Sequence, residues 1–335
     1  MPIVAEPPRV RHDRELARAR PPTEPAVELT LDELVSHYER HGALRNTPRT
    51  LELNLSIVQK FLDFAHRGSG GTPVPITAVT PLLIESYALE RKEMGRASWT
   101  INRELGALSV YFGCAVRLGL LSENLVKRVL KLPVVRNRLP RTLRPREVSA
   151  LLRESEKPVL FHGRNGKGQG NSRERLTPLY DMVLFVLNVG LRLGELLHLE
   201  WDDVDLDRGL IHVTNKPQHT LKGRQDRVVR SNTVVLKLLR RRCETESRWV
   251  FSGAQGQQLD RANALRELKV AGGRAGLSWV NWLVLRRTFL TRCAASHMPP
   301  YVLREIAGHS SLRTTERFYI GAVDGPEWTP PEVRS

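Results

Sequence analysis

The spacing of apolar residues divides the chain into a helical part, a break and a second, mixed part. From residue 28 to residue 132, apolar residues recur every three or four positions, which is the period of an amphipathic helix. Segments such as "SWTINRELGALSVYFGCAVRLGLL" carry this pattern, and Thr30 is placed to cap the first helix. The pattern predicts an N-terminal domain of about four helices without strands.

Two stretches before the second part lack this period. Residues 1–27 are rich in proline and arginine, which predicts a disordered tail. The segment "PVVRNRLPRTLRPREV" holds three prolines and five arginines in sixteen residues. Because proline disfavours helix at its own and the preceding position, residues 133–142 are predicted to form an extended, basic linker.

The second domain is predicted over residues 143–322, with residues 323–335 as a tail. Its helical segments are interrupted at Gly190 and by a glycine-rich polar loop over residues 162–175, which lacks the strand and helix of a phosphate-binding P-loop. The runs "GLIHVTN" and "RQDRVVR" predict a small antiparallel sheet. Further helices are expected to begin near the following residues: Ser231, Asp260, Leu285 and Pro300. The fold class is therefore mainly α, with one small sheet in the second domain.

The charge of the chain is strongly positive and unevenly distributed. The 52 lysines and arginines exceed the 36 acidic residues by 16, and residues 141–335 carry 32 basic and 21 acidic residues. An excess of this size indicates a polyanionic partner, and a basic surface kept for solubility is the alternative.

Other classes of protein are disfavoured by the sequence. No apolar run approaches the roughly 18 residues of a membrane span, and the N-terminus lacks the apolar core of a signal peptide. Cys114, Cys243 and Cys293 are widely separated, so the sequence indicates neither a disulfide framework nor a zinc site. We expect a cytoplasmic, nucleoid-associated protein without a membrane partner.

Two segments resemble the signature boxes of the tyrosine recombinase (phage integrase) family. The first is "GLRLGELLHLEWDDVD", and the second runs from "LRRTFLTRCAAS" to "YVLREIAGHSSLRTTERFY". The resemblance implies a helical, SAM-like core-binding domain that clamps DNA, followed by a catalytic domain of the DNA breaking-rejoining fold. The family's catalytic residues match these positions: Arg192, Lys222, Arg286, His309 and Tyr319.

The chemistry of phosphodiester cleavage independently supports a role for Arg192 and Arg286 in binding the phosphate. Cleaving a phosphodiester without a metal requires other groups to neutralise the charge on its non-bridging oxygens, and guanidinium groups do so through planar hydrogen bonds. Arg192 follows the break at Gly190 and Arg286 precedes an apolar run, so both are predicted near helix starts, which favour anions. An ion pair of Arg192 with Glu195 is the structural alternative.

The remaining candidates are acids and bases. Lys222, in a turn between strands, can protonate the leaving 5′-oxygen, with Lys216 as a competing candidate and a solvent-facing lysine as the structural alternative. His309 can donate to the phosphate or accept the proton of the tyrosine, unless it is only a structural hydrogen-bonding residue.

The sequence departs from the family pattern at two positions. The histidine usual three residues before the second arginine is replaced by Leu283, so Asn281, Trp282 or Arg287 would have to supply a donor. The family's tyrosine most often lies nine residues after the histidine, where this chain has Phe318, with Tyr319 one position later.

The register of the tyrosine decides which side chain faces the histidine. One step along a helix rotates a side chain by ~100° and advances it by ~1.5 Å. The structural alternative for Tyr319 is a half-buried aromatic residue at a helix end. Tyr301, expected to be a packing residue, is the nearest substitute as nucleophile.

Two classes of function follow. The first is a site-specific recombinase or integrase that forms a 3′-phosphotyrosyl link without metal, ATP or other cofactor; its partners would be double-stranded DNA, three further copies in a tetramer on DNA and an accessory DNA-bending protein. The second is an integrase-like DNA-binding protein with impaired chemistry. An enzyme of the type IB topoisomerase kind would use the same chemistry on one duplex, but the compact "GHSS" segment favours a recombinase.

Overall fold

The structure is a computed structural model of the 335-residue chain and describes residues 29–44, 46–134, 141–161, 173–175, 178–221, 225–243 and 247–320. The chain divides into two compact units, Met1–Arg136 and Asn137–Ser335. The predicted tails at residues 1–27 and 323–335, and most of the linker, lie outside the described residues. No described helix is both long enough and apolar enough to cross a membrane.

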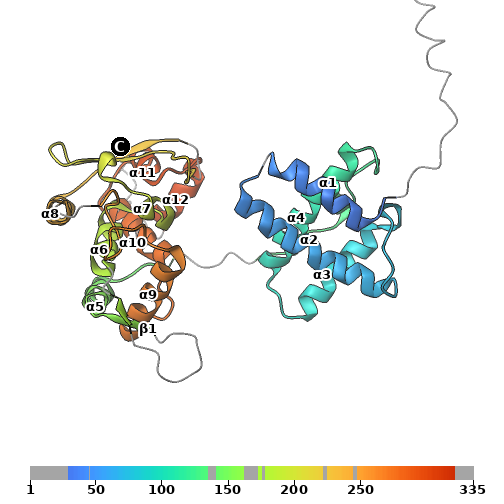
Figure 1. The fold of residues 1–335 in the computed structure, drawn as a ribbon, viewed down its shortest axis with the longest axis horizontal. Coiled ribbons are helices and arrows are strands. Elements are labelled where there is room, and N and C mark those ends of the chain that lie inside the picture. Colours follow the sequence, from blue (N-terminus) through green and yellow to red (C-terminus); the bar gives the residue numbers. More distant parts are fainter. Residues whose placement is uncertain are drawn as a thin grey trace, which may run out of the picture. The chain divides into compact units, whose positions relative to one another are not determined.

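The described part of the first unit is helical, as the apolar spacing predicts. It contains α1 (Leu31–Ala43), α2 (Pro48–Gly68), α3 (Pro81–Glu93) and α4 (Ser98–Arg117), with short 3₁₀ turns at Ile76–Ala78 and Leu125–Arg128 (Figure 1). Thr30 caps α1 as predicted, because its hydroxyl accepts from the backbone N–H of Glu33.

The core of the first unit is aromatic. The rings of Phe61, Tyr87, Tyr111 and Phe112 are almost fully buried, and Phe61 meets Tyr87 and Phe112 edge to face. Such edge-on contacts add to the free energy of burial by about 1 kcal/mol each. The unit therefore has a core of its own.

The second unit is built around two central helices, α6 (Leu179–Val189) and α10 (Trp282–Ala295), which lie against each other (Figure 1). α6 is apolar at almost every position, which explains its burial. Around this pair lie α5 (Pro145–Ser155), α7 (Leu193–Leu197), α8 (Thr233–Arg242), α9 (Arg261–Arg274), α11 (Pro300–Ala307) and α12 (Leu312–Ile320).

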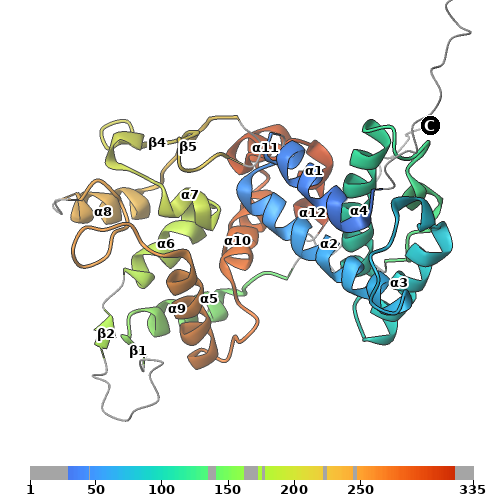
Figure 2. The same cartoon turned by 45° about the vertical axis from the view of Figure 1, so that its right-hand side comes forward.

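One antiparallel sheet joins β3 (Val204–Asp205), β4 (Leu210–Val213) and β5 (Arg227–Arg230) in that order. Ile211 pairs with Val229, and both side chains are buried in the core, while the alternate positions point outward. Strand β5 lies beside α11 (Figure 2), which brings the hairpin to the second signature box. The mainly α fold with a small antiparallel sheet is confirmed, but the described residues also contain a second, two-stranded sheet.

Two local predictions were wrong. The polar loop expected over residues 162–175 ends in a strand, because β2 (Arg173–Arg175) pairs with β1 (Val159–Phe161). Helix α10 begins at Trp282 and not near Leu285, because the side chain of Asn281 caps it by accepting from the N–H of Val284. Arg286 consequently lies inside the helix.

Candidate active site

Arg192 lies at the N-cap of α7, as its position after the break predicts. Helix α6 ends at Gly190, whose φ of 73° is in the left-handed region, and the ring of Phe289 fills the space that a Cβ would need. Arg192 Nη1 donates to Glu195 Oε1 at 2.8 Å, and its backbone N–H donates to Oε2 at 2.9 Å. The predicted alternative, an ion pair with Glu195, is therefore present, but the carboxylate is buried.

Arg286 lies in the second turn of α10, and its side chain is buried. Its Nη1 donates to the carbonyl of Gly190 at 2.6 Å, and its Nη2 donates to the carbonyl of Ala307. Arg286 is thus near the start of α10, as expected, but its guanidinium reaches the C-terminal ends of α6 and α11. Helix C-termini carry unpaired carbonyls and partial negative charge, so they stabilise a cation.

The C-terminal end of α11 holds three arginines together. Three consecutive carbonyls accept one hydrogen bond each from a different guanidinium group. The pairs are Ile306 with Arg227 Nε at 2.9 Å, Ala307 with Arg286 Nη2, and Gly308 with Arg192 Nη2 at 3.1 Å. Segments far apart in the sequence thus converge on one helical turn.

Glu195 is the counterion of this cluster. Arg227 Nη2 donates to its Oε2 at 2.6 Å, and Nη1 donates to its Oε1 at 3.2 Å. Burial by itself would raise the pKa of Glu195, but the hydrogen bonds and charge of Arg227, together with Arg192, lower it to about 2. Burial and the neighbouring Arg192 lower the pKa of Arg286 to about 9. The cluster holds three guanidiniums and one carboxylate, so an anion would be favoured there.

His309 follows this turn directly. Its Nδ1 and the hydroxyl of Thr315 are hydrogen-bonded at 3.0 Å, which fixes the ring orientation. The ring of Phe318 stacks on it, with centroids 5.8 Å apart and 14° between the planes. Phe318 is also buried among apolar residues of α10 and α11. Of the two aromatic residues, Phe318 is therefore the one that faces His309.

Tyr319 points elsewhere. Its hydroxyl donates to the carbonyl of Met298, in the turn between α10 and α11. Burial raises the pKa of Tyr319, and the neighbouring Cys293 raises it further. Tyr301, expected to be a packing residue, is instead 65% exposed at the start of α11.

Lys222 lies outside the described residues, but the base of its turn is described. Asp226 Oδ1 accepts from the backbone N–H of Asn215 and from its side-chain amide, both at 2.8 Å. Asn215 Oδ1 accepts from the N–H of Leu221 at 2.9 Å. These bonds close the turn on both sides of Lys222.

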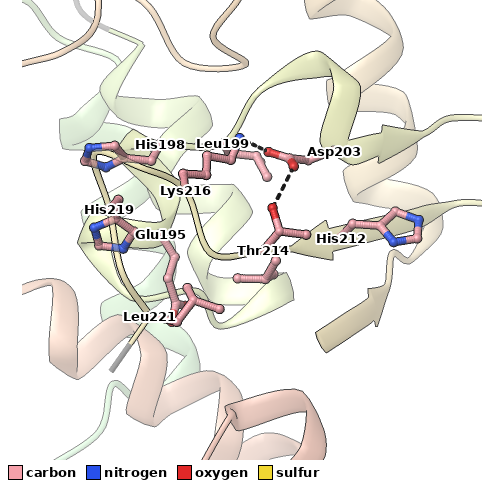
Figure 3. A pocket seen from close by; sticks show the side chains of 10 residues that line it. Glu195, His198, Leu199, Asp203, His212, Thr214, Lys216, His219 and Leu221 are labelled. Carbon is pink, nitrogen blue, oxygen red and sulfur yellow. Dashed lines mark hydrogen bonds and ion pairs between the residues drawn. The ribbon is translucent and has the colours of Figure 1, made fainter. Parts of the chain in front are cut away.

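The competing candidate, Lys216, is engaged in ion pairs. Its ammonium lies 2.6 Å from Asp203 Oδ2 (Figure 3). It also lies 3.1 Å from Glu200 Oε1. In the same view the rings of His198 and His219 stack with centroids 4.4 Å apart. Burial and the charge of His198 lower the pKa of His219. The ammonium of Lys216 is thus paired with two carboxylates.

Leu283 is 52% exposed on α10 and offers no polar atom. Two of the expected substitutes already use their polar groups: Asn281 caps α10, and the indole N–H of Trp282 donates to the carbonyl of Ala264 at 3.1 Å. Arg287 is half-buried and is the remaining candidate. Among the described residues, no group of three or more His, Cys, Asp and Glu side chains is arranged to hold a metal ion.

Sequence reasoning did not assign a role to Glu195 beyond a surface pair, and it missed Arg227. The only signal for Glu195 is its position three residues after Arg192. Arg227 lies in the predicted strand "RQDRVVR", where an arginine ordinarily points to solvent. Its contacts with a carbonyl 79 residues away have no counterpart in local sequence.

Comparison with known proteins places this architecture. The chain is 28% identical over 292 residues to the tyrosine recombinase XerA of Thermococcus kodakarensis. The aligned region covers 85% of this chain and 89% of that relative. The integrase of the Tn1549 transposon, in complex with a circular intermediate DNA, has the same fold, with a TM-score of 0.65 at 19% identity over 87% of this chain and 95% of that one. The structure of a lambda integrase tetramer bound to a Holliday junction has a TM-score of 0.66 at 17% identity, over 92% of this chain and 82% of that one. The family model for the phage integrase family matches residues 141–324, which is more than half of the chain, and the protein therefore belongs to that family.

Proposed function

We propose that the protein is a site-specific DNA recombinase that cuts and rejoins DNA through a 3′-phosphotyrosyl intermediate. The observation that carries the proposal is the convergence of Arg192, Arg286 and His309 at the end of α11, in a cluster with more guanidinium than carboxylate groups. Its relatives of known name include tyrosine recombinases. A scissile phosphate is the anion that this chemistry requires.

Each residue then has a defined task. Arg192 and Arg286 donate to the non-bridging oxygens and offset the charge that develops on them. Tyr319 attacks the phosphorus, the 5′-oxygen leaves with a proton from Lys222, and His309 donates to the phosphate or accepts the tyrosine proton. A 5′-hydroxyl from a partner strand reverses the steps, and bond energy is conserved without ATP.

The proposal extends to partners. The basic linker and second unit would bind double-stranded DNA, and the active species would be a tetramer assembled on two duplexes, with an accessory DNA-bending protein where the site needs one. Solved neighbours of the same fold bound to DNA support this assembly. We propose Trp328 as the anchor of the C-terminal segment in a neighbouring copy; it lies outside the described residues.

Helix α12 favours a second candidate function. Phe318 occupies the position against His309, and the hydroxyl of Tyr319 is bound to Met298. If α12 keeps this arrangement on DNA, the protein is a DNA-binding relative with impaired chemistry, acting as a regulator or competitor at recombination sites.

The experiment that separates the two uses a nicked suicide substrate. The protein is incubated, with EDTA and without ATP, with a library of nicked duplexes that carry a randomised central segment, and covalent protein–DNA complexes are recovered after denaturation. Cleavage beside the nick releases a short fragment and prevents rejoining. A recombinase accumulates adducts on a defined sequence, whereas retention of a specific sequence under native conditions without any adduct supports the impaired DNA-binding protein.

A further inference from the structure

We propose that Arg227 is a positioning residue of this site, which fastens the C-terminal turn of α11 to strand β5 and so sets the places of His309 and the two phosphate-binding arginines. This inference rests on the proposed function for its catalytic consequence. Arg227 does not reach the reacting atoms, because its side chain is 5% exposed and its bonds point inward.

The contacts of Arg227 join three elements. Its Nε donates to the carbonyl of Ile306 in α11, and its two terminal nitrogens hold both oxygens of Glu195 in α7. Arg227 itself begins β5. A planar guanidinium is suited to this geometry because it donates along two edges at fixed angles. Lysine, with one terminal nitrogen, cannot make both contacts.

The turn of α11 fits closely against this side chain. Gly308 has a φ of 58°, and a Cβ at that position would lie 3.1 Å from Arg227 Nη1 and 3.3 Å from its Cδ and Cζ. The backbone of the turn therefore rests on the guanidinium group. Because Ala307 and Gly308 receive Arg286 and Arg192, a shift of this turn would move both arginines together with His309.

The same side chain maintains the charge state of Glu195. The hydrogen bonds and charge of Arg227 are the largest influences that keep the buried carboxyl ionised. An ionised Glu195 holds Arg192 through its side chain and backbone. Arg227 thus acts on Arg192 by two routes, through the carbonyl of Gly308 and through Glu195.

The test is Arg227→Lys, with Arg242→Lys as the matched control. Arg242 makes the same kind of contacts in the same unit, donating to the carbonyl of Val250 at 2.9 Å and to Asp181 at 2.8 Å, but away from the site. We expect Arg227→Lys to slow adduct formation on the nicked duplex by roughly a hundredfold, the scale of a displacement of about 1 Å. DNA affinity should stay within about threefold, because Arg227 has no access to the phosphates. Arg242→Lys should lower stability without slowing the reaction.

Chemical rescue distinguishes positioning from general damage. Arg227→Ala should be slow and should regain activity when guanidinium ion at non-denaturing concentration fills the vacated space. Adduct formation by Arg227→Lys at the wild-type rate would overturn the proposal, as would an equal loss of rate in Arg242→Lys. If Arg227→Ala does not fold, the lysine variant carries the test.

A measurement without DNA separates this inference from the proposed function. Amide hydrogen exchange of residues 306–311 should be faster in Arg227→Lys than in wild type, and unchanged in Arg242→Lys. If the wild-type protein forms no adduct, the proposed function fails, and exchange alone decides whether Arg227 fastens the turn. Equal exchange in all three proteins overturns the inference even if the wild type is active.

Discussion

The arginine cluster and helix α12 differ in how closely their side chains match the arrangement that the proposed reaction needs. In the cluster, Arg192, Arg227 and Arg286 each have fixed partners at the end of α11. In α12, the hydroxyl of Tyr319, the proposed nucleophile, donates to a carbonyl of a neighbouring turn, and Phe318 takes the place beside the histidine. The fold therefore holds the three arginines together, whereas the hydroxyl of the proposed nucleophile points away from His309.

The difference has a physical basis in what each element buries. The cluster is held by charge-assisted hydrogen bonds in a buried setting, which fix geometry. Helix α12 buries Phe318 and makes hydrogen bonds through Thr315 and Tyr319. Exposing a side chain such as Phe318 costs about 1.5–3 kcal/mol. Bringing Tyr319 to the histidine requires a rotation of ~100° about the helix axis. Contacts with assembled DNA could supply a free energy of that size.

The largest effect on the rate of adduct formation is expected for a variant of Lys222, with a variant of Lys216 in the same hairpin as the comparison. Lys222→Ala should slow adduct formation by roughly 10² to 10⁴, the contribution of a general acid. Lys216→Met should lower the melting temperature and leave the rate near wild type, because its ammonium is already held by Asp203 and Glu200. A fast Lys222→Ala together with a slow Lys216→Met would reverse the assignment. Quenched-flow gels give the rates, and calorimetry gives the stability.

The next largest effect is expected on stability, when Glu195, the counterion of the arginine cluster, is replaced. Replacing Glu195 by Gln leaves three guanidiniums without a carboxylate, and the loss of one partner of a buried pair costs about 3–5 kcal/mol. The pH dependence follows from the pKa of about 2 in the folded protein against a reference value of 4.5. Stabilisation by Glu195 is present above pH 4.5 and is lost as pH falls towards 2, a change on the order of 3 kcal/mol.

Urea denaturation at several pH values measures this effect. Wild type should lose stability over that acid range, whereas Glu195→Gln should be less stable at neutral pH and depend less on pH. Parallel curves for the two proteins would show that Glu195 is not the buried counterion.

Changing the register of the aromatic pair tests the other region. Phe318→Tyr places a hydroxyl next to His309, and we expect adduct formation to rise by up to roughly a hundredfold if misplacement limits the rate. Adding Leu283→His supplies the missing donor and should raise the rate further. If wild type forms no adduct but Phe318→Tyr does, alone or together with Leu283→His, the natural chain is the impaired DNA-binding relative. Unchanged rates would mean that α12 repositions fully on DNA.

The smallest effects are expected for the arginines in and next to the linker, whose contribution to DNA binding is electrostatic. DNA affinity should fall steeply with salt, and each of Arg136, Arg138, Arg141 and Arg144 that contacts phosphate should contribute about 0.9 to the slope of log affinity against log salt. Arg141 also lies over the ring of Trp279 at 3.7 Å. Arg144→Ala should reduce the slope equally on all sequences and leave the adduct rate at saturating DNA unchanged, with Arg144→Lys as the control. Affinity independent of salt would remove nucleic acid as the partner.

Local signals in the sequence predicted much of the fold and part of the site. Periodicity and the Thr30 cap predicted the first helices, and the glycine break placed Arg192 at a helix start. Helical spacing also showed that only one of Phe318 and Tyr319 could face the histidine. What it could not predict depends on distant backbone: Arg286 is satisfied by a carbonyl 96 residues away, and Arg227 by one 79 residues away. Hydrogen bonds to backbone carbonyls leave no residue type to recognise.

The most direct test of the account locates the covalent link. The wild-type adduct formed on the nicked duplex is digested with protease and nuclease, and mass spectrometry identifies the residue that carries the nucleotide. We expect the nucleotide on Tyr319. Tyr319→Phe should form no adduct but should bind DNA within a factor of about three of wild type, because only one hydroxyl is lost. A nucleotide on another residue, such as the exposed Tyr301, or an adduct that persists in Tyr319→Phe, would contradict it.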